Sequence, residues 1–211
     1  IGLGSSAALT VALVAALTKS TDVLDGARRV HRLFQGGSGS GVDIAAGVTG
    51  GLIEYTMHGA EVLTLPWPDD LAYRLIWTGV PASTRSKLGQ LQGANRRPSR
   101  EALADAATSM AAAWRSAADV LAELQAYIEV LRQFSDEHDL GIFDAGHDKL
   151  VAEARSAGLV YKPCGAGGGD VGILLGRSNT QLDEFVIGIG VPGCRPLSFA
   201  LDVKGVDLEQ R

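Results

Sequence analysis

Glycine and hydroxyl residues gather at the start of the chain, where the run Gly2-Leu3-Gly4-Ser5-Ser6-Ala7 precedes the apolar stretch 7–17. That stretch has the composition of a helix. A helix N-terminus carries unpaired backbone N–H groups and partial positive charge, and glycine lets a phosphate approach them closely. The hydroxyls of Ser5 and Ser6 could cap the helix, bond phosphate oxygens or ligate Mg²⁺. The Gly-Lys-Ser/Thr ending of a Walker A loop is absent.

A carboxylate follows the second glycine-rich run. Residues 36–41 read GGSGSG, and Asp43 stands two positions later. Asp43 could orient or deprotonate an attacking hydroxyl or hold Mg²⁺, and the alternative is a carboxylate that only caps a helix. His31 and Gln35 lie four residues apart, so they share a helix face and could contact either this loop or a substrate.

A third glycine run, Gly165-Ala166-Gly167-Gly168-Gly169, lies between two apolar segments. Lys162, just before it, could stabilise a phosphate or be a surface lysine. Cys164 is interpreted as a packing residue, because no histidine is linked to it by a motif. The 27 glycines among 211 residues are roughly 13% of the chain against a usual ~7%. Their clustering favours cradles for anions over ordinary turns.

The elements that must position these runs form a mixed pattern of helices and strands. The stretch 7–17 is apolar on every face, so we expect a helix that is buried all round. The helices are grouped and do not alternate strictly with strands, which favours an α+β fold. Helices are expected at 7–17, 22–35, 43–47, 99–134 (as two helices) and 149–156, and strands at 51–57, 62–65, 73–78, 159–161, 171–176, 185–191 and 196–203. A helical turn around residues 180–186 is the alternative before the last two segments.

Composition excludes several classes of protein. With 19 Lys and Arg against 24 Asp and Glu, the net charge is −5 and there is no basic surplus for nucleic acid. Two cysteines cannot form a disulfide scaffold. The longest apolar stretch falls short of the ~20 residues that span a membrane, and no signal peptide is visible. We therefore expect a cytoplasmic protein that binds a small molecule, with no nucleic acid and no membrane as partner.

Taken together, the three runs resemble motifs of the galactokinase–homoserine kinase–mevalonate kinase–phosphomevalonate kinase (GHMP) superfamily. GLGSSAA is similar to its ATP-phosphate loop, and KPCGAGGGD resembles its C-terminal glycine motif, with Cys164 in place of a serine. The similarity is greatest to the phosphomevalonate kinase branch. Residues 31–43 reproduce the spacing AH-x-x-AQG-x-x-GSG-x-D, with Phe34 in place of the alanine, and residues 77–84 match WTG-x-PAST.

The resemblance implies a GHMP-kinase-like fold of two domains. Residues 1–80 would be the remainder of an N-terminal, ribosomal-S5-like ATP-binding domain, and residues 81–211 a C-terminal, ferredoxin-like domain. Members of the family carry a long segment before the phosphate loop, including a lysine that contacts substrate or phosphate. This chain starts at the loop, at Ile1. We therefore expect either a further N-terminal segment or a fragment.

The resemblance also implies a reaction, the phosphorylation of 5-phosphomevalonate to 5-diphosphomevalonate in the mevalonate pathway, with ATP and Mg²⁺. Asp43 would be catalytic and face the acceptor, and Ser6 would face Mg²⁺. The ATP phosphates would lie on Gly2, Leu3, Gly4, Ser5, Ser6 and Ala7. The acceptor would be held by Ser83, Thr84, Gly165, Ala166, Gly167, Gly168 and Gly169.

Two other functions stay open. One is another GHMP kinase, acting on mevalonate or a sugar. The other is a truncated remnant without activity that self-associates, because the apolar helix at 7–17 would lack part of its cover. A homo-oligomer is therefore also possible.

Overall fold

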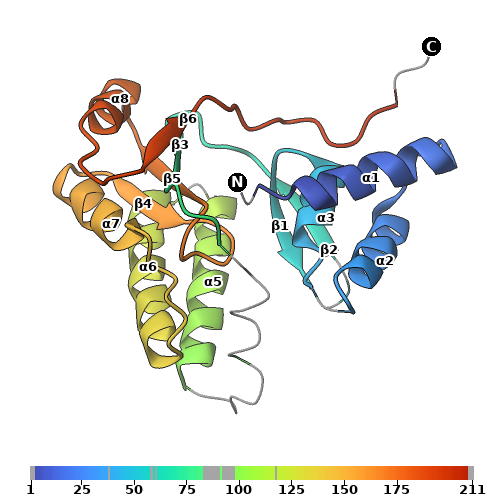
Figure 1. The fold of residues 1–211 in the computed structure, drawn as a ribbon, viewed down its shortest axis with the longest axis horizontal. Helices are drawn as coiled ribbons and strands as arrows, with labels where there is room; N and C mark the ends of the chain where they lie inside the picture. Colours follow the sequence, from blue (N-terminus) through green and yellow to red (C-terminus); the bar gives the residue numbers. More distant parts are fainter. Residues whose placement is uncertain are drawn as a thin grey trace. The chain divides into compact units, whose positions relative to one another are not determined.

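The computed structural model describes residues 3–37, 39–57, 59, 61–82, 91, 98–116 and 118–208. They form two compact units (Figure 1). The N-terminal unit contains Leu3–Trp67 and the chain from Ala200 onward, and the central unit contains Pro68–Phe199. Both combine helices with antiparallel strands, which confirms an α+β fold. Along the chain, the first boundary between these units falls between residues 67 and 68. The two family domains, which the resemblance divides between residues 80 and 81, stay a prediction.

Three helices and a hairpin build the N-terminal unit. Helix α1 packs on α2 and α3, and α3 contacts β1. The residues that meet in this core are mainly small, including Ala7, Ala15 and Ala27, so the helices approach closely. The elements are α1 (Ser5–Thr18), α2 (Leu24–Phe34), α3 (Val42–Thr49), β1 (Leu52–Thr56) and β2 (Glu61–Leu65).

Helix α1 is buried along one face only. Ala7, Val11 and Ala15 are buried, at the four-residue spacing of one helix face. On the other faces the exposed fractions of Leu9, Leu13 and Leu17 are 61%, 52% and 83%. The expectation of a helix buried all round is therefore wrong for the described residues, because their packing partners lie along a single face.

The C-terminal segment, residues 200–208, returns to this unit. The Gly51 amide donates to the Asp202 carbonyl at 2.9 Å, and the Val206 amide donates to the Val48 carbonyl at 3.1 Å. Val206 and Leu208 pack against the core around α1. A Cβ atom at Gly50 would collide with the backbone of residues 204–205, so glycine is required where the two segments cross.

A four-stranded antiparallel sheet with the strand order β4-β5-β3-β6 forms the centre of the other unit. Trp77 at the end of β3 pairs with Val171 at the start of β5, so the third glycine motif ends beside the end of β3. The strands are β3 (Ala72–Trp77), β4 (Val160–Pro163), β5 (Val171–Gly176) and β6 (Arg195–Leu197).

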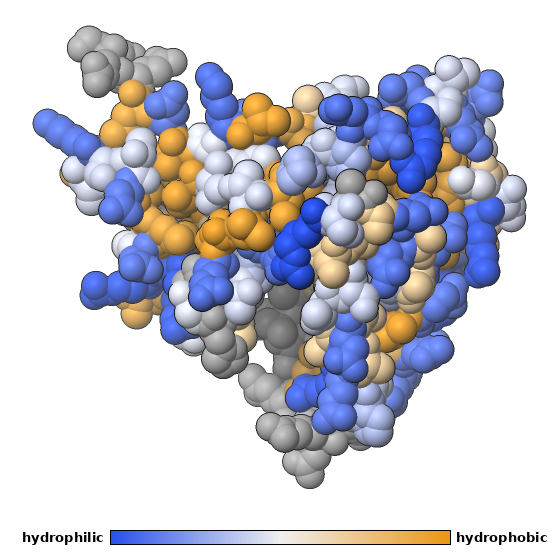
Figure 2. Space-filling view, turned by 180° about the vertical axis from the view of Figure 1, so that it is seen from behind, coloured by the Kyte–Doolittle hydropathy of each residue, from blue (hydrophilic) through white to orange (hydrophobic). Residues whose placement is uncertain are grey.

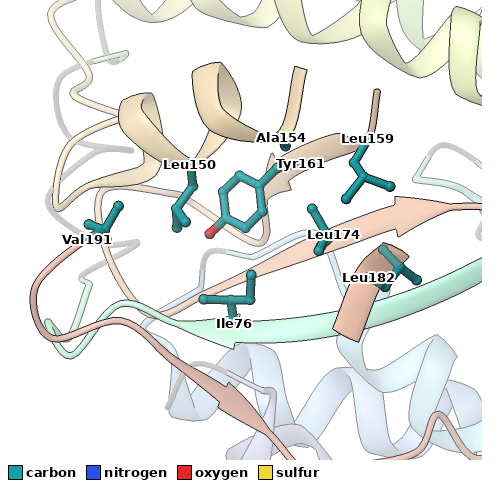
Figure 3. Packing of buried hydrophobic residues seen from close by; sticks show 8 residues of the cluster. All are labelled: Ile76, Leu150, Ala154, Leu159, Tyr161, Leu174, Leu182 and Val191. Carbon is teal, nitrogen blue, oxygen red and sulfur yellow. The ribbon is translucent and has the colours of Figure 1, made fainter. Parts of the chain in front are cut away.

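Four described helices accompany this sheet. The long helices α5 and α6 form an antiparallel pair (Figure 1). Helices α6 and α7 contact β4, and α8 contacts β3 and β5. Figure 3 shows the Tyr161 ring among the aliphatic side chains of this core, between Leu150 and Leu174. The helices are α5 (Pro98–Ser116), α6 (Val120–Glu137), α7 (His147–Ser156) and α8 (Asn179–Ile187).

The strand predicted at 185–191 is wrong, and the alternative of a helical turn around 180–186 is confirmed. Residues 185–187 belong to α8, because the Ser178 hydroxyl accepts the Gln181 amide at 3.3 Å and starts a helix there. The strand expected at 196–203 is reduced to β6, and the rest of that stretch leads into the C-terminal segment. The break of 99–134 into two helices is confirmed, with Asp119 capping α6 through the Ala122 amide.

Candidate functional site

The start of α1 has no side-chain cap. Gly4 occupies the N-cap with a φ of 72°, and it makes no side-chain cap hydrogen bond. Ser5 and Ser6 are helical residues, so the expectation that their hydroxyls cap the helix is wrong. The free N–H groups of this turn, with the positive end of the helix dipole, suit an anion.

The start of α3 repeats this arrangement and lies against the start of α1. Its N-cap is Gly41, with a φ of 81° and again no side-chain cap. Asp43 stands in the first turn and is exposed. A Cβ atom on Gly4 would lie only 3.7 Å from the Cβ of Asp43. Two positive helix ends thus meet at one place, where Asp43 supplies one negative charge and a bound phosphate would supply more.

His31 and Gln35 of α2 extend this place through a hydrogen-bonded chain. The Nε2 atom of His31 lies 3.2 Å from the Ser6 hydroxyl and 3.5 Å from the Gln35 side-chain nitrogen. His31 is buried. The shared helix face predicted for these two residues therefore points at the phosphate loop.

A cationic cavity of about 360 Å³ adjoins His31 and Gln35. Its walls are α2 and the backbone of residues 39–41. Three arginines line it, Arg28, Arg29 and Arg32, against one carboxylate, Asp25, which lies 3.7 Å from Arg28. Arg28 and Arg32 stand one turn apart, a spacing at which like charges repel. The cavity is therefore suited to an anionic ligand.

The sequence motifs assign these arginines no role. The available signal was their spacing, with three arginines within five positions on the helix that leads into a glycine-serine loop. Arg28 also supports that loop. Its guanidinium lies 6.0 Å from the centroid of the Tyr55 ring, and the Tyr55 hydroxyl donates to the Ser40 carbonyl at 2.9 Å.

In the central unit, the third glycine motif is fixed by two neighbouring loops. The Gly168 amide donates to the Ile142 carbonyl at 2.7 Å, and the Asp170 amide donates to the Val80 carbonyl at 2.7 Å. A Cβ atom at Gly167 would lie 2.5 Å from the Ile142 oxygen, and one at Gly169 would lie 2.7 Å from the Val80 oxygen. These glycines are therefore required by close packing within the unit, and their expected role in holding the acceptor stays a prediction.

A buried histidine anchors the same motif. The Nε2 atom of His147 lies 2.9 Å from the Gly169 carbonyl oxygen, and its Nδ1 atom lies 2.8 Å from the Tyr161 hydroxyl. A carbonyl only accepts, so Nε2 carries the proton and the Tyr161 hydroxyl donates to Nδ1. Burial raises the pKa of Tyr161, which keeps this hydroxyl protonated.

Lys162 and Cys164 are engaged inside the central unit. The Lys162 ammonium donates to the Pro163 carbonyl at 2.9 Å and lies 5.7 Å from the centroid of the Tyr127 ring. Burial lowers the pKa of Lys162 and raises the pKa of the Cys164 thiol. This fits the interpretation of Cys164 as a packing residue, whereas a role for Lys162 in binding phosphate gains no support.

The other predicted site residues are placed as follows. Leu3 to Ala7 lie at the start of α1 with Asp43 beside Gly4, whereas Gly2, Ser83 and Thr84 lie outside the described residues. Within the described part of the chain, no three His, Cys, Asp or Glu side chains cluster as metal ligands. Mg²⁺ in kinases is usually held by one or two protein groups and the substrate phosphates, so Ser6 and Asp43 fit that ion. None of the described helices could cross a membrane.

The chain is similar in sequence to several kinases. No family model matches the chain. The chain is 34% identical to the phosphomevalonate kinase of Streptomyces sp. strain CL190, over 82% of this chain and 56% of that protein. It is 32% identical to human mevalonate kinase, over 87% of this chain and 53% of that protein, and 28% identical to mevalonate kinase of Thermococcus onnurineus, over 99% and 65%. The chain thus spans a little over half to two thirds of these relatives.

Solved structures share the fold. The Lin0012 protein of Listeria innocua aligns with a TM-score of 0.83 at 23% identity, over 94% of this chain and 66% of that one. Streptococcus pneumoniae phosphomevalonate kinase aligns with a TM-score of 0.69 at 17% identity, over 87% and 64%. The chain thus shares its fold with these proteins. The chain belongs to the GHMP kinase superfamily.

Proposed function

We propose that the protein transfers the γ-phosphoryl group of ATP to 5-phosphomevalonate, giving 5-diphosphomevalonate and ADP. The observation that carries this proposal is the meeting of two uncapped helix starts at Gly4 and Asp43, beside a cavity lined by three arginines. The first feature suits the ATP phosphates, and the second suits an acceptor that is itself anionic. The name of the Streptomyces relative supports the same acceptor.

In this proposal the phosphate loop neutralises charge. The backbone N–H groups of residues 4–7 bind phosphate oxygens, and Ser6 and Asp43 hold Mg²⁺. The ion, when bound, supplies charge neutralisation across the ATP phosphates. Phosphoryl transfer depends mainly on positioning and electrostatic stabilisation, which explains a site rich in glycine amides and poor in acids and bases.

The acceptor chemistry decides what Asp43 must do. A phosphate monoester carries about −1.5 to −2 charge at pH 7, so its oxygen attacks without first losing a proton. The bond from this oxygen to the γ-phosphorus forms as the bond to the β–γ bridging oxygen breaks, and ADP leaves. Asp43 then orients the acceptor and holds the ion. With mevalonate as acceptor, Asp43 would instead have to take the proton of an alcohol.

A substrate panel tests the proposal. ATP is supplied with 5-phosphomevalonate, mevalonate, homoserine or galactose, and products are identified by ³¹P NMR. We expect a diphosphate from 5-phosphomevalonate and little turnover of the others. The assay uses this chain and a form with any coding residues that precede Ile1, because relatives are longer. Preferred turnover of mevalonate would establish the mevalonate kinase alternative, which two relatives support by name. Absence of turnover in both forms would contradict the proposal.

A further inference from the structure

His31 contacts the one hydroxyl of the phosphate loop that is expected to face a metal ion. Its exposed fraction is 4%, so water does not compete for its ring. A single ring nitrogen, Nε2, lies 3.2 Å from the Ser6 hydroxyl and 3.5 Å from the side-chain nitrogen of Gln35. The proton on the Ser6 oxygen therefore depends on the state of this nitrogen.

The neighbours of Nε2 decide where the protons lie. The side-chain nitrogen of Gln35 can only donate, so Nε2 must accept and carries no hydrogen. The neutral ring then carries its proton on Nδ1. The Ser6 hydroxyl, facing an acceptor, donates its proton to His31.

This arrangement determines what Ser6 can bind. A serine hydroxyl has one proton and two lone pairs. Because the Ser6 hydroxyl directs its hydrogen at His31, only the lone pairs of the Ser6 oxygen remain for a ligand at the start of α1. Such an oxygen can ligate a cation but cannot donate to a phosphate oxygen. The sequence left both roles open, and the hydrogen bonds favour the first.

We propose that His31, oriented by Gln35, is a positioning residue whose Nε2 atom accepts the hydrogen bond of the Ser6 hydroxyl and thereby leaves the Ser6 lone pairs free to ligate a cation. Only the identity of the bound species, a divalent cation with a nucleotide, rests on the proposed function. The proton arrangement stands on the contacts of His31 alone. The two parts can therefore be tested separately.

The first experiment measures the ring protons directly. ¹⁵N NMR at pH 8 distinguishes a protonated from an unprotonated ring nitrogen, and the four histidines are assigned with His31→Gln. We expect the His31 proton on Nδ1, and an Nε2 resonance that shifts in Ser6→Ala because its hydrogen-bond donor is lost. A proton on Nε2, or no shift in Ser6→Ala, would overturn the inference.

The second experiment measures binding of the ATP analogue AMPPNP by calorimetry, with Mg²⁺ and with EDTA. In His31→Leu we expect the Mg²⁺-dependent gain in affinity to fall by about tenfold, the loss typical when the partner of a metal ligand is removed. Affinity in EDTA should not change. His31→Gln should restore most of the gain, because an amide oxygen can accept the Ser6 proton.

Leu33→Ala is the matched control, since Leu33 is on the same helix and is 81% exposed. Melting curves establish whether each variant is folded. If His31→Leu is unfolded, the Mg²⁺ dependence of His31→Gln is compared with that of the unchanged protein instead. An equal Mg²⁺ dependence in all variants would overturn the inference. Failure of the unchanged chain to bind AMPPNP in either condition would count against the proposed function, and the ring-nitrogen measurement would then decide the inference alone.

Discussion

Asp43 is an exposed carboxylate in the first turn of α3. We expect Asp43→Asn to change the free energy of unfolding by less than about 0.5 kcal/mol, as surface changes usually do. Turnover should fall by about 10²–10³, the loss typical when one electrostatic group leaves a transition state. Asp148→Asn is the matched control, because Asp148 is also an exposed first-turn acid, on α7. A near-normal kcat in Asp43→Asn would contradict this role and show that Asp43 only caps the helix.

Arg32 lines the cationic cavity, so its substitution tests whether this cavity binds the acceptor. Arg32→Ala should raise KM for 5-phosphomevalonate by about 10- to 100-fold, since hydrogen bonds to charged groups contribute roughly 1.5–3 kcal/mol. The KM for ATP should change little. Arg155→Ala, which removes an exposed arginine of α7, is the control. An equal rise of both KM values would contradict a role in acceptor binding.

The two cysteines offer a test that needs no activity. Burial raises the pKa of the thiols of Cys164 and Cys194, and for Cys194 the nearby Glu153 adds to the effect. A raised pKa means less thiolate at a given pH, and thiolate is the reactive form. We expect iodoacetamide at pH 8 to alkylate both cysteines far more slowly in the folded protein than in urea, measured by mass spectrometry. Equal rates would show that both thiols are accessible and unshifted.

Between elements, His147 ties α7 to β4 and to the third glycine motif through two buried hydrogen bonds. His147→Leu leaves the Tyr161 hydroxyl and the Gly169 carbonyl without these partners. Each unsatisfied buried group costs roughly 1–3 kcal/mol, so we expect a loss of about 2–6 kcal/mol in the free energy of unfolding. Tyr161→Phe, which removes one of the two bonds, should cost less. Urea denaturation measures both, and an unchanged midpoint in His147→Leu would contradict this anchoring.

Most elements could be predicted from the sequence pattern, because α2 and α6 bury residues at helical spacing and the apolar strand β5 is buried along nearly its whole length. The wrong strand at 185–191 shows the limit of that signal. Phe185 and Val186 are apolar and β-branched or aromatic, yet the cap at Ser178 and the burial of Leu182 keep them in α8. The anchoring of the third motif by His147 could not be predicted, because the partners of His147 come from positions 161 and 169, and only the fold brings these together.

At the scale of the molecule, several large apolar side chains of the described residues are exposed. Leu9, Leu13 and Leu17 of α1 are more than half exposed, and apolar side chains also reach the surface elsewhere (Figure 2). Soluble monomers rarely leave contiguous apolar patches of this kind open. We expect the 211-residue chain to self-associate, seen by size-exclusion chromatography with light scattering. Leu13→Gln combined with Leu17→Gln should reduce the association, and a monomer at all concentrations would contradict it.

The return of the C-terminal segment to the N-terminal unit has a consequence for synthesis. The central unit is continuous in the chain, whereas the N-terminal unit is completed by Val206 and Leu208, which a ribosome adds after all of residues 68–199. At about 5–20 residues per second, translating that interval takes on the order of ten seconds. The nascent N-terminal unit therefore waits with Val48 and Gly51 unpaired, while the central unit is already free to fold. Chaperones that bind nascent chains should therefore bind this protein at α1.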